Sequence, residues 1–169
     1  MDLDALTDRC LGAFVAAGTL DLSLDRVAEV VGTSKRMLVH YFGGREELEI
    51  RVIGRLEDRL RARFSLAIYP AGTTLAQVVG ALWETSTAPE SRGVLQVVME
   101  VSRRGWSGSE RAKAFYLEQQ RLWVELLRRF GAEADVVEEL LQVFQGAVLI
   151  YLVTGDREQG RRGLARVVG

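Results

Sequence analysis

The sequence contains few of the residues on which enzyme active sites and metal centres depend. Its 169 residues include one cysteine, Cys10, and one histidine, His40. A single cysteine cannot form a disulfide within the chain, and a single histidine leaves no Ser-His-Asp or Cys-His arrangement to be assembled elsewhere. The neighbouring carboxylates of Glu46 and Glu47 point to different faces of a helix and do not form a metal site. We therefore expect no enzyme, no catalytic residues, no bound metal and no cofactor.

Strand patterns, prolines and long apolar runs are also scarce. The two prolines, Pro70 and Pro89, lie in turn-like contexts, and no alternating strand pattern of useful length occurs. The longest apolar run, residues 147–153, is far short of the roughly 20 residues needed to cross a bilayer. The acidic beginning of the chain has no basic region followed by an apolar one, which argues against a signal peptide. These features predict an all-α protein that is soluble and cytoplasmic, with no membrane partner.

A short segment, residues 23–45, carries the most informative positive signal. Four apolar residues in it recur at the spacing of one helical face: Leu24, Val27, Ala28 and Val31. Ser23 stands just before them with a side chain suited to capping a helix N-terminus, and Gly32 follows with the conformational freedom that a helix C-terminus needs. Thr33 and Ser34 then offer hydroxyls to cap a second helix. The segment is predicted to form two helices joined by one tight turn.

The second of these helices has an apolar side and a basic side. Leu38 and Phe42 are four residues apart and are expected to pack inward. This arrangement turns four other side chains outward: Lys35, Arg36, Val39 and His40. Between residues 33 and 45 there are three basic residues and no acidic ones, although the whole chain has a net charge of −1. A focused basic face of this kind fits the major groove of DNA; the alternative is a solvated face with no partner.

The segment resembles the DNA-reading part of the TetR family of transcriptional regulators. The family pattern runs Ile-Ala-x-x-Ala-Gly-Val-Ser-x-x-x-Leu-Tyr-x-His-Phe-x-x-Lys-x-x-Leu, and it matches residues 27–48 of this chain. Six positions agree outright: Ala28, Gly32, Ser34, Leu38, Phe42 and Leu48. Val27 and Arg45 are conservative replacements. Val39 and Tyr41 depart from the pattern, because the family usually has tyrosine and histidine at these positions.

The resemblance implies a set of DNA contacts. The expected phosphate contacts are Ser23, Thr33, Ser34 and the backbone near Arg45, at the N-terminal end of the following helix. Five residues of the second helix are candidates for base edges: Lys35, Arg36, Met37, His40 and Tyr41. Among them Arg36 has the chemistry that best suits a specific contact, to a guanine. Val39 stands where the family has a tyrosine that touches the DNA backbone, which leaves that phosphate contact open.

The remainder of the chain is predicted to be helical as well. The first helix carries an apolar stripe that makes Cys10 a small core residue and not a redox sensor. Five apolar residues step by four along a linking helix that begins near Glu46: Leu48, Val52, Leu56, Leu60 and Phe64. Further helices are expected at 75–87, 91–104, 109–130, 133–153 and 156–167. The predicted division is an N-terminal three-helix helix-turn-helix domain (1–45), the linking helix (46–66) and a C-terminal helical ligand-binding and dimerisation domain (67–169).

The penultimate helix carries two adjacent apolar stripes, where the surface helix of a monomer needs only one. In the TetR family the last two helices pair across a two-fold axis into a four-helix dimer interface. The resemblance places that interface on six residues: Leu141, Phe144, Val148, Tyr151, Gly160 and Leu164. The alternative is a central helix wrapped by its own domain. A homodimer would set two recognition helices roughly 34 Å apart, as a palindromic site requires.

The resemblance also implies a small-molecule pocket among the helices from 75 to 153. Large or adaptable apolar side chains are available to line it: Trp83, Met99, Trp106, Phe115, Tyr116, Trp123 and Phe144. Candidate orienting groups are Gln119, Gln120 and Gln145. The alternative for each aromatic residue is core filling. The expected ligand is a small apolar effector without strong charge, which shifts the population away from the conformation that binds DNA.

Taken together, these features predict a homodimeric, ligand-responsive transcriptional repressor that binds a double-stranded DNA operator. The alternative is a helical ligand-sequestering or protein-interaction module that no longer reads DNA, which Val39 and the near-neutral net charge favour. Salt-dependent, sequence-selective DNA binding distinguishes the two. The operator, the effector and the choice between repression and activation are left open by the sequence.

Overall fold

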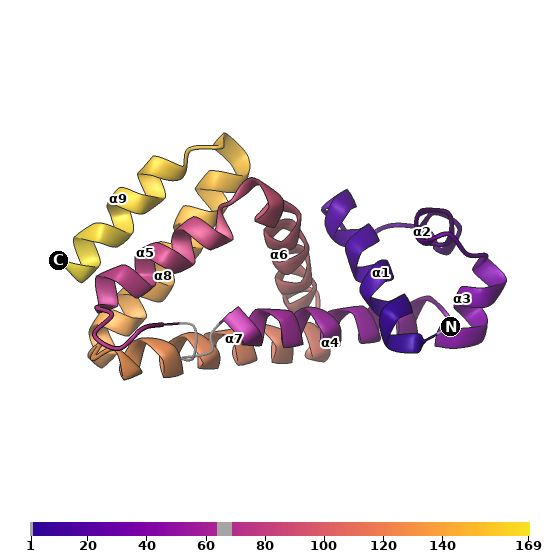
Figure 1. Ribbon diagram of the computed structural model, residues 1–169, viewed down its shortest axis with the longest axis horizontal. Coiled ribbons are helices and arrows are strands. Elements are labelled where there is room, and N and C mark those ends of the chain that lie inside the picture. The colour runs from indigo at the N-terminus through magenta and orange to yellow at the C-terminus, as the bar shows by residue number, and fades with distance from the viewer. Residues whose placement is uncertain (1, 64–68) are drawn as a thin grey trace.

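The computed structural model describes residues 2–63 and 69–169, and these residues form helices and connecting turns without a strand (Figure 1). The helices are α1 (Leu3–Ala17), α2 (Leu24–Val31), α3 (Lys35–Phe42), α4 (Arg45–Arg63), α5 (Leu75–Ser86), the short 3₁₀ helix η2 (Pro89–Ser91), α6 (Arg92–Trp106), α7 (Glu110–Arg129), α8 (Ala134–Thr154) and α9 (Arg157–Val168). The predicted all-α class is confirmed. The bounds of α5 to α9 lie within two residues of those expected from the sequence. Phe64 and the predicted end of the linking helix at residue 66 lie outside the described residues.

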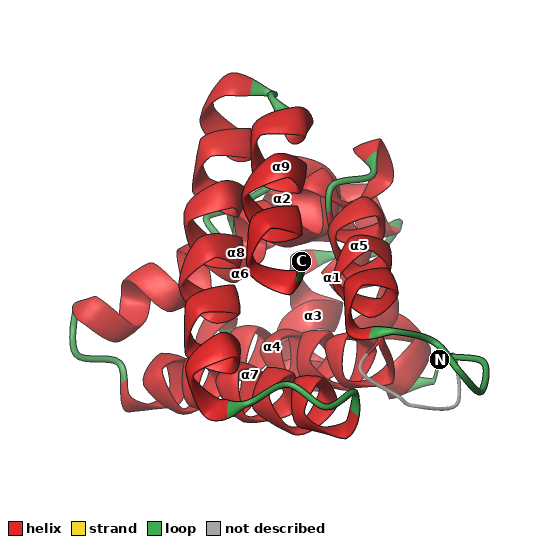
Figure 2. Ribbon diagram, turned by 90° about the vertical axis from the view of Figure 1, so that its left-hand side faces the viewer, coloured by secondary structure: helices red, strands yellow, loops and turns green. Residues whose placement is uncertain are grey.

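The molecule is elongated, with α1, α2 and α3 at one end and the C-terminus at the other (Figure 1). We call α1–α3 the reader and α5–α9 the cavity region. Helix α4 runs from the reader along the cavity region, and α7 packs against it. Helix α6 is the helix of the cavity region that lies against the reader, where it contacts α1. Figure 2 shows the molecule from the end that carries the C-terminus, with α5, α8 and α9 towards the viewer.

Two clusters of buried apolar side chains hold the helices together. The first is built mainly from α1–α4, and it also takes in Val97 and Val101 of α6 and Ala112 and Phe115 of α7. The second joins α5, α7, α8 and α9 around the fully buried ring of Trp83. The first cluster therefore crosses from the reader into α6 and α7, so the reader is not packed as an isolated unit.

Cys10 lies in the first cluster with no exposed surface, as its place on the apolar stripe of α1 predicts. Burial raises the pKa of the Cys10 thiol to about 11. A buried, protonated thiol is a poor nucleophile. The interpretation of Cys10 as a core residue is confirmed.

The backbones of α1 and α6 approach each other closely where the reader meets the cavity region. A Cβ atom placed on Gly93 of α6 would lie 1.9 Å from the carbonyl oxygen of Val15 in α1. Only glycine permits this approach, because any side chain would overlap a backbone atom that cannot rotate away. Gly93 therefore fixes the distance between the reader and α6.

Helix α8 is, among the described residues, the one helix long and apolar enough by length and composition to cross a bilayer, with a mean hydropathy of 1.6 over an 18-residue window. The core helix of a soluble protein passes the same test. One side of α8 packs into the second cluster through six buried residues: Val137, Leu140, Phe144, Ala147, Val148 and Tyr151. The hydropathy of α8 is thus accounted for in part by its role in the core.

Candidate DNA-reading surface and ligand cavity

The turn between α2 and α3 has the capping geometry that the sequence predicts. The Ser23 hydroxyl oxygen accepts a hydrogen bond from the Arg26 backbone N–H at 3.1 Å, and the Ser34 hydroxyl oxygen accepts one from Met37 N–H at 3.2 Å. Gly32 ends α2 in the left-handed region, with φ 69°. Helices of 8 residues are marginal in isolation, so these caps and the core contacts define where α2 and α3 begin and end.

The two sides of α3 are arranged as expected. Leu38 and Phe42 are buried in the first cluster. Four side chains on the opposite side are exposed: Lys35, Arg36, Val39 and His40. Met37 is half-buried, and Tyr41 packs partly against the first cluster, where its ring meets the His40 ring edge-on with centroids 5.3 Å apart. Of the five candidates for base edges, Tyr41 is therefore committed in part to the core of the reader.

Lys35 and Arg36, two cations on the exposed face of α3, differ in the contacts that they make within the protein. Lys35 Nζ forms an ion pair with Asp25 Oδ2 of α2 at 2.9 Å. More than half of each side chain is exposed, so the pair contributes at most about 1 kcal/mol and is easily exchanged for a phosphate. Arg36 is exposed and forms no ion pair or hydrogen bond with any described residue. Arg36 is thus the cation of α3 that can bind a base edge without breaking a contact.

The Arg45 side chain points inward. Its guanidinium donates hydrogen bonds to the carbonyl oxygens of Leu20 and Leu22 and to Glu49, and it lies 5.9 Å from the centroid of the Phe14 ring. This side chain fixes the loop between α1 and α2 to the start of α4. What remains for a phosphate is the backbone at the N-terminus of α4, where the first N–H groups have no intrahelical partner. The hydroxyls of Ser23 and Ser34 also keep their own protons to donate.

A polar network that the sequence analysis missed joins the same loop to α6. The Glu100 carboxylate accepts hydrogen bonds from the Thr19 hydroxyl and the Leu20 N–H, both at 2.8 Å. Arg104 donates to Glu100 at 3.0 Å and to Glu49 at 2.5 Å. Burial alone would raise the pKa of Glu100, but these hydrogen bonds outweigh it and hold the pKa below the ordinary value. No pattern in the sequence signals these pairings, because Glu100 lies about 80 positions from its loop partners.

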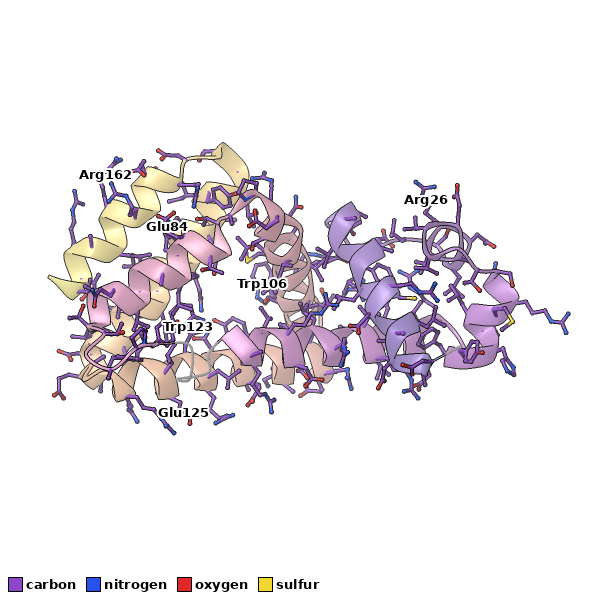
Figure 3. The ribbon with its side chains drawn as sticks, in the orientation of Figure 1. Arg26, Glu84, Trp106, Trp123, Glu125 and Arg162 are labelled. Carbon is purple, nitrogen blue, oxygen red and sulfur yellow. The ribbon has the colours of Figure 1, made fainter. Side chains whose placement is uncertain are left out.

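A cavity of about 520 Å³ lies among α4, α5, α6, α7 and α8. Six of the seven apolar residues predicted to line a pocket do so: Met99, Trp106, Phe115, Tyr116, Trp123 and Phe144. The three candidate orienting glutamines line it as well. Figure 3 labels Trp106 near the end of α6 and Trp123 on the inner side of α7, while Glu125 points to the outer side. The sequence therefore predicted most of the aromatic lining of this cavity.

Trp83 is a correction to that prediction. Its side chain has no exposed surface, its indole N–H donates to the Arg157 carbonyl at 3.2 Å, and its ring meets Phe144 edge-on at 5.5 Å. Trp83 is a core residue between α5, α8 and α9. Core filling, the alternative left open for each aromatic residue, is the correct interpretation here.

The polar groups of the cavity wall are few. The Tyr116 hydroxyl donates to Gln145 Oε1 at 3.2 Å, which links α7 to α8. The amide nitrogen of Gln119 is buried and has no hydrogen-bond partner among the described residues. Among the described residues that line the cavity, Lys113 is the charged one and none is a carboxylate; the sequence did not single out Lys113. Lys113 could have been noticed as the only lysine beyond Lys35.

Most residues assigned to the dimer interface are packed inside the protomer. Phe144, Val148, Tyr151 and Leu164 belong to the second cluster, each with at most 8% of its surface exposed. Gly160 does permit a close helix approach, but to the protomer's own Trp83, whose Cζ2 would lie 2.3 Å from an added Cβ. Leu141 lines the cavity. The large apolar side chains that α8 leaves exposed are Leu149 and Val153, at 52% and 77%.

Comparison with known proteins gives matches among solved structures only. No family model matches the sequence, and no curated protein is similar to it. A transcriptional regulator from Rhodococcus sp. Rha1 superposes with a TM-score of 0.79 at 17% identity, covering 100% of this chain and 95% of that chain. A TetR-family regulator from Streptomyces coelicolor gives a TM-score of 0.75 at 18% identity (99% and 80%), and one from Rhodococcus sp. gives 0.74 at 19% identity (98% and 96%).

These structures match over nearly the whole length of the chain, helix-turn-helix and C-terminal helices together. The likeness drawn from residues 27–48 is confirmed at the level of the fold. This chain has the fold of the TetR-family transcriptional regulators.

Proposed function

We propose that this protein is a DNA-binding transcriptional regulator. The observation that carries the proposal is the exposed face of α3, where Arg36 has no ion pair or hydrogen bond with a described residue and stands beside Lys35 and His40. Arginine binds guanine O6 and N7 with two parallel hydrogen bonds, which makes Arg36 the specificity-determining residue. The face also follows a capped turn of the kind that presents a recognition helix to the major groove.

The remaining proposed DNA contacts are of two kinds, contacts to phosphates and contacts to base edges. Ser23, Thr33, Ser34 and the N-terminus of α4 at Arg45 bind phosphates through hydroxyls, backbone N–H groups and the positive end of the helix. Lys35, Met37 and His40 supplement Arg36 at the base edges, and Tyr41 contributes its exposed edge. This division assigns the DNA-reading domain to residues 1–45, the linking helix to 46–66 and the effector and dimerisation domain to 67–169.

The operator is palindromic and is bound by a homodimer in this proposal. The face of α8 that carries the exposed residues Leu149 and Val153 is available to a second copy, because the other side of the helix packs in the protomer. Two copies related by a two-fold axis would present their α3 helices to successive major grooves roughly 34 Å apart.

The protein acts as a repressor that a small, largely apolar effector releases. Helix α6 lines the cavity through Met99 and Ser102, and the same helix holds the α1–α2 loop through Glu100 and Arg104. A ligand that binds better to a shifted position of α6 would therefore shift the reader as well. Such a ligand moves the population towards conformers whose α3 helices no longer fit two successive grooves.

The proposal is tested by selecting bound sequences from a random duplex library with the purified protein. Binding of the selected duplex and of a scrambled duplex is then measured at two salt concentrations. We expect a palindromic site, and an affinity that falls steeply with salt as several phosphate contacts require. A folded protein that enriches no sequence at low salt would overturn the proposal.

The second candidate function is a ligand-sequestering module that no longer reads DNA. Two observations favour it: the pairing of Lys35 with Asp25, and the exposed Val39 on the face of α3. It requires the cavity but not the recognition helix. The same selection separates the two functions, because a sequestering module would bind its ligand and enrich no operator.

A further inference from the structure

The cavity contains a hydrogen-bond donor that the protein itself does not use. Gln119 lies on α7 in the cavity lining, and its Nε2 atom is buried without a partner among the described residues. Most buried polar groups in native proteins are paired, so an unpaired one indicates a missing acceptor. Filling the cavity with an apolar molecule alone would leave this donor unpaired in an even drier environment.

The neighbouring polar groups do not supply that acceptor. Gln145 Oε1 accepts a hydrogen bond from the Tyr116 hydroxyl, 3.2 Å away, and accepts none from Gln119 Nε2. The rest of the lining is mainly aliphatic and aromatic, including Met99, Trp123 and Phe144. Gln119 Nε2 is therefore left without an acceptor among the described residues. A ligand oxygen placed beside it would accept its hydrogen bond.

The charges around the cavity restrict the kind of oxygen. A carboxylate buried beside the neutral amide of Gln119 would lose its hydration without gaining a counter-charge. Lys113, the charged residue of the described lining, is exposed and repels a cationic ligand, and no carboxylate in this part of the lining attracts one. The acceptor at Gln119 must then be uncharged, and a negative group is tolerated only near Lys113.

We propose that the cavity binds an apolar molecule with an uncharged carbonyl oxygen, which accepts a hydrogen bond from Gln119 Nε2, and that Lys113 disfavours cationic ligands. The volume of about 520 Å³ suits a molecule of the size of a drug or a secondary metabolite. This inference deepens the proposed function and rests on it for the role of the ligand as effector. The binding itself requires no DNA.

The first experiment compares benzophenone with diphenylmethane, which has nearly the same shape and lacks the carbonyl. Binding to the full chain is measured by titration calorimetry without DNA. We expect the wild-type protein to bind benzophenone about ten-fold more tightly, the size of one buried hydrogen bond. Gln119→Leu should abolish this preference without lowering the melting temperature, because it removes a buried nitrogen that has no hydrogen-bond partner in the described part of the free protein.

Gln120→Leu is the matched control. Gln120 is the adjacent glutamine on α7 and also lines the cavity, but it has no buried unpaired nitrogen. The Gln120→Leu variant should keep the preference for benzophenone. Preference lost equally in both variants would overturn the assignment to Gln119.

The second experiment tests the sign of the charge. The probes are para-benzoylbenzoate, an anion, and para-aminomethylbenzophenone, a cation. Because Lys113 is exposed, we expect only a roughly two- to five-fold preference for the anion, and Lys113→Met should remove it. A preference for the cation would overturn the role given to Lys113.

Wild-type protein that binds benzophenone and diphenylmethane equally, or binds neither, would overturn the inference. These outcomes are separable from a failure of the proposed function. The titrations contain no DNA, so operator selection can fail while the carbonyl preference stands, and it can succeed while the preference is absent.

Discussion

The reader and the cavity region are both helical, but they are stabilised in different ways. In the reader, α2 and α3 have 8 residues each, and each begins at a serine cap and ends at a left-handed glycine. In the cavity region, α7 and α8 have 20 and 21 residues and enclose part of a cavity of about 520 Å³. Short helices need caps and a closed core, whereas long helices with extensive packing elsewhere tolerate a cavity along part of their length.

In the proposed function, specificity resides in the reader and responsiveness to a ligand resides in the cavity region. The reader presents a fixed α3, because its caps and the buried Leu38 and Phe42 leave one arrangement of the exposed face. The cavity region retains a buried donor, Gln119 Nε2, that no described residue pairs, and space for a ligand. The two are joined at α6, by the close approach at Gly93 and the hydrogen bonds of Glu100. Substitutions that break these contacts at α6, or that change only one of the two parts, should differ in the size of their effects.

The largest effect is expected from Gly93→Ala. The added methyl group would overlap the Val15 carbonyl oxygen, so α1 and α6 must separate, at a cost of about 3 kcal/mol in the free energy of unfolding. Gly12→Ala is the control, since an added Cβ on this glycine of α1 meets nothing within 4 Å. It should instead stabilise the protein by up to about 1 kcal/mol. Urea unfolding measures both, and equal effects of the two substitutions would contradict the close approach.

The next effect is that of Glu100→Ala. Removing the carboxylate leaves the Leu20 N–H and the Thr19 hydroxyl without their acceptor and leaves Arg104 with Glu49 alone, which should cost about 2 kcal/mol. The exposed Glu139 of α8 provides the comparison, because Glu139→Ala should change stability by less than about 0.5 kcal/mol. Chemical denaturation checks both values. If Glu100→Ala is as mild as Glu139→Ala, the network does not hold the loop.

Arg36→Ala tests the reader alone. It should weaken binding to the selected operator by about 1–3 kcal/mol and binding to scrambled DNA much less, because the lost contact is to a base edge. Arg26→Ala removes the same charge from α2, where Arg26 is paired with Glu29 at 2.6 Å, and should affect the two duplexes alike. Fluorescence anisotropy with both duplexes measures the difference. An equal loss on both duplexes for Arg36→Ala would make Arg36 a phosphate contact.

The smallest effect is expected from the ion pairs of Asp8 with Arg55 and Arg59, which stabilise the fold less at acid pH. Hydrogen bonds from Arg55 and Arg59 lower the pKa of Asp8 from 3.8 to about 2. Because the folded pKa is depressed, this stabilisation is present above pH 3.8 and is lost as the pH falls towards 2. The groups are partly exposed, so it amounts to less than about 1 kcal/mol. The acid limb of a stability-against-pH curve should flatten in Asp8→Asn, and an unchanged slope would contradict the prediction.

Residues whose roles depend on near neighbours were predictable. Ser23, Gly32 and Ser34 act within three or four positions of themselves, so their capping roles follow from local sequence. The burial of Leu38 and Phe42 follows from their spacing on one helical face. The bounds of the later helices were predictable for the same reason. Caps and apolar spacings within one turn of helix are therefore set by neighbouring residues in the sequence.

The assignment of Trp83 to the pocket, and of Phe144, Val148 and Tyr151 to the dimer interface, did not anticipate that these side chains pack in the protomer's own second cluster, and the reason is physical. Helical periodicity tells which side of a helix is apolar, but not whether its own chain, a ligand or a second copy covers that side. In this protein α5 and α9 cover the stripe, with Trp83 packed against Gly160.

The sequence by itself determined the helices, the capped turn, the exposed basic face of α3 and most of the apolar residues of the cavity, because each depends on contacts within a few positions along the chain. The tertiary structure alone decided the joint at Gly93, the pairing of Glu100 with the α1–α2 loop and the isolation of the Gln119 amide. These features depend on which groups meet across helices distant in sequence, and neither spacing nor composition specifies such meetings.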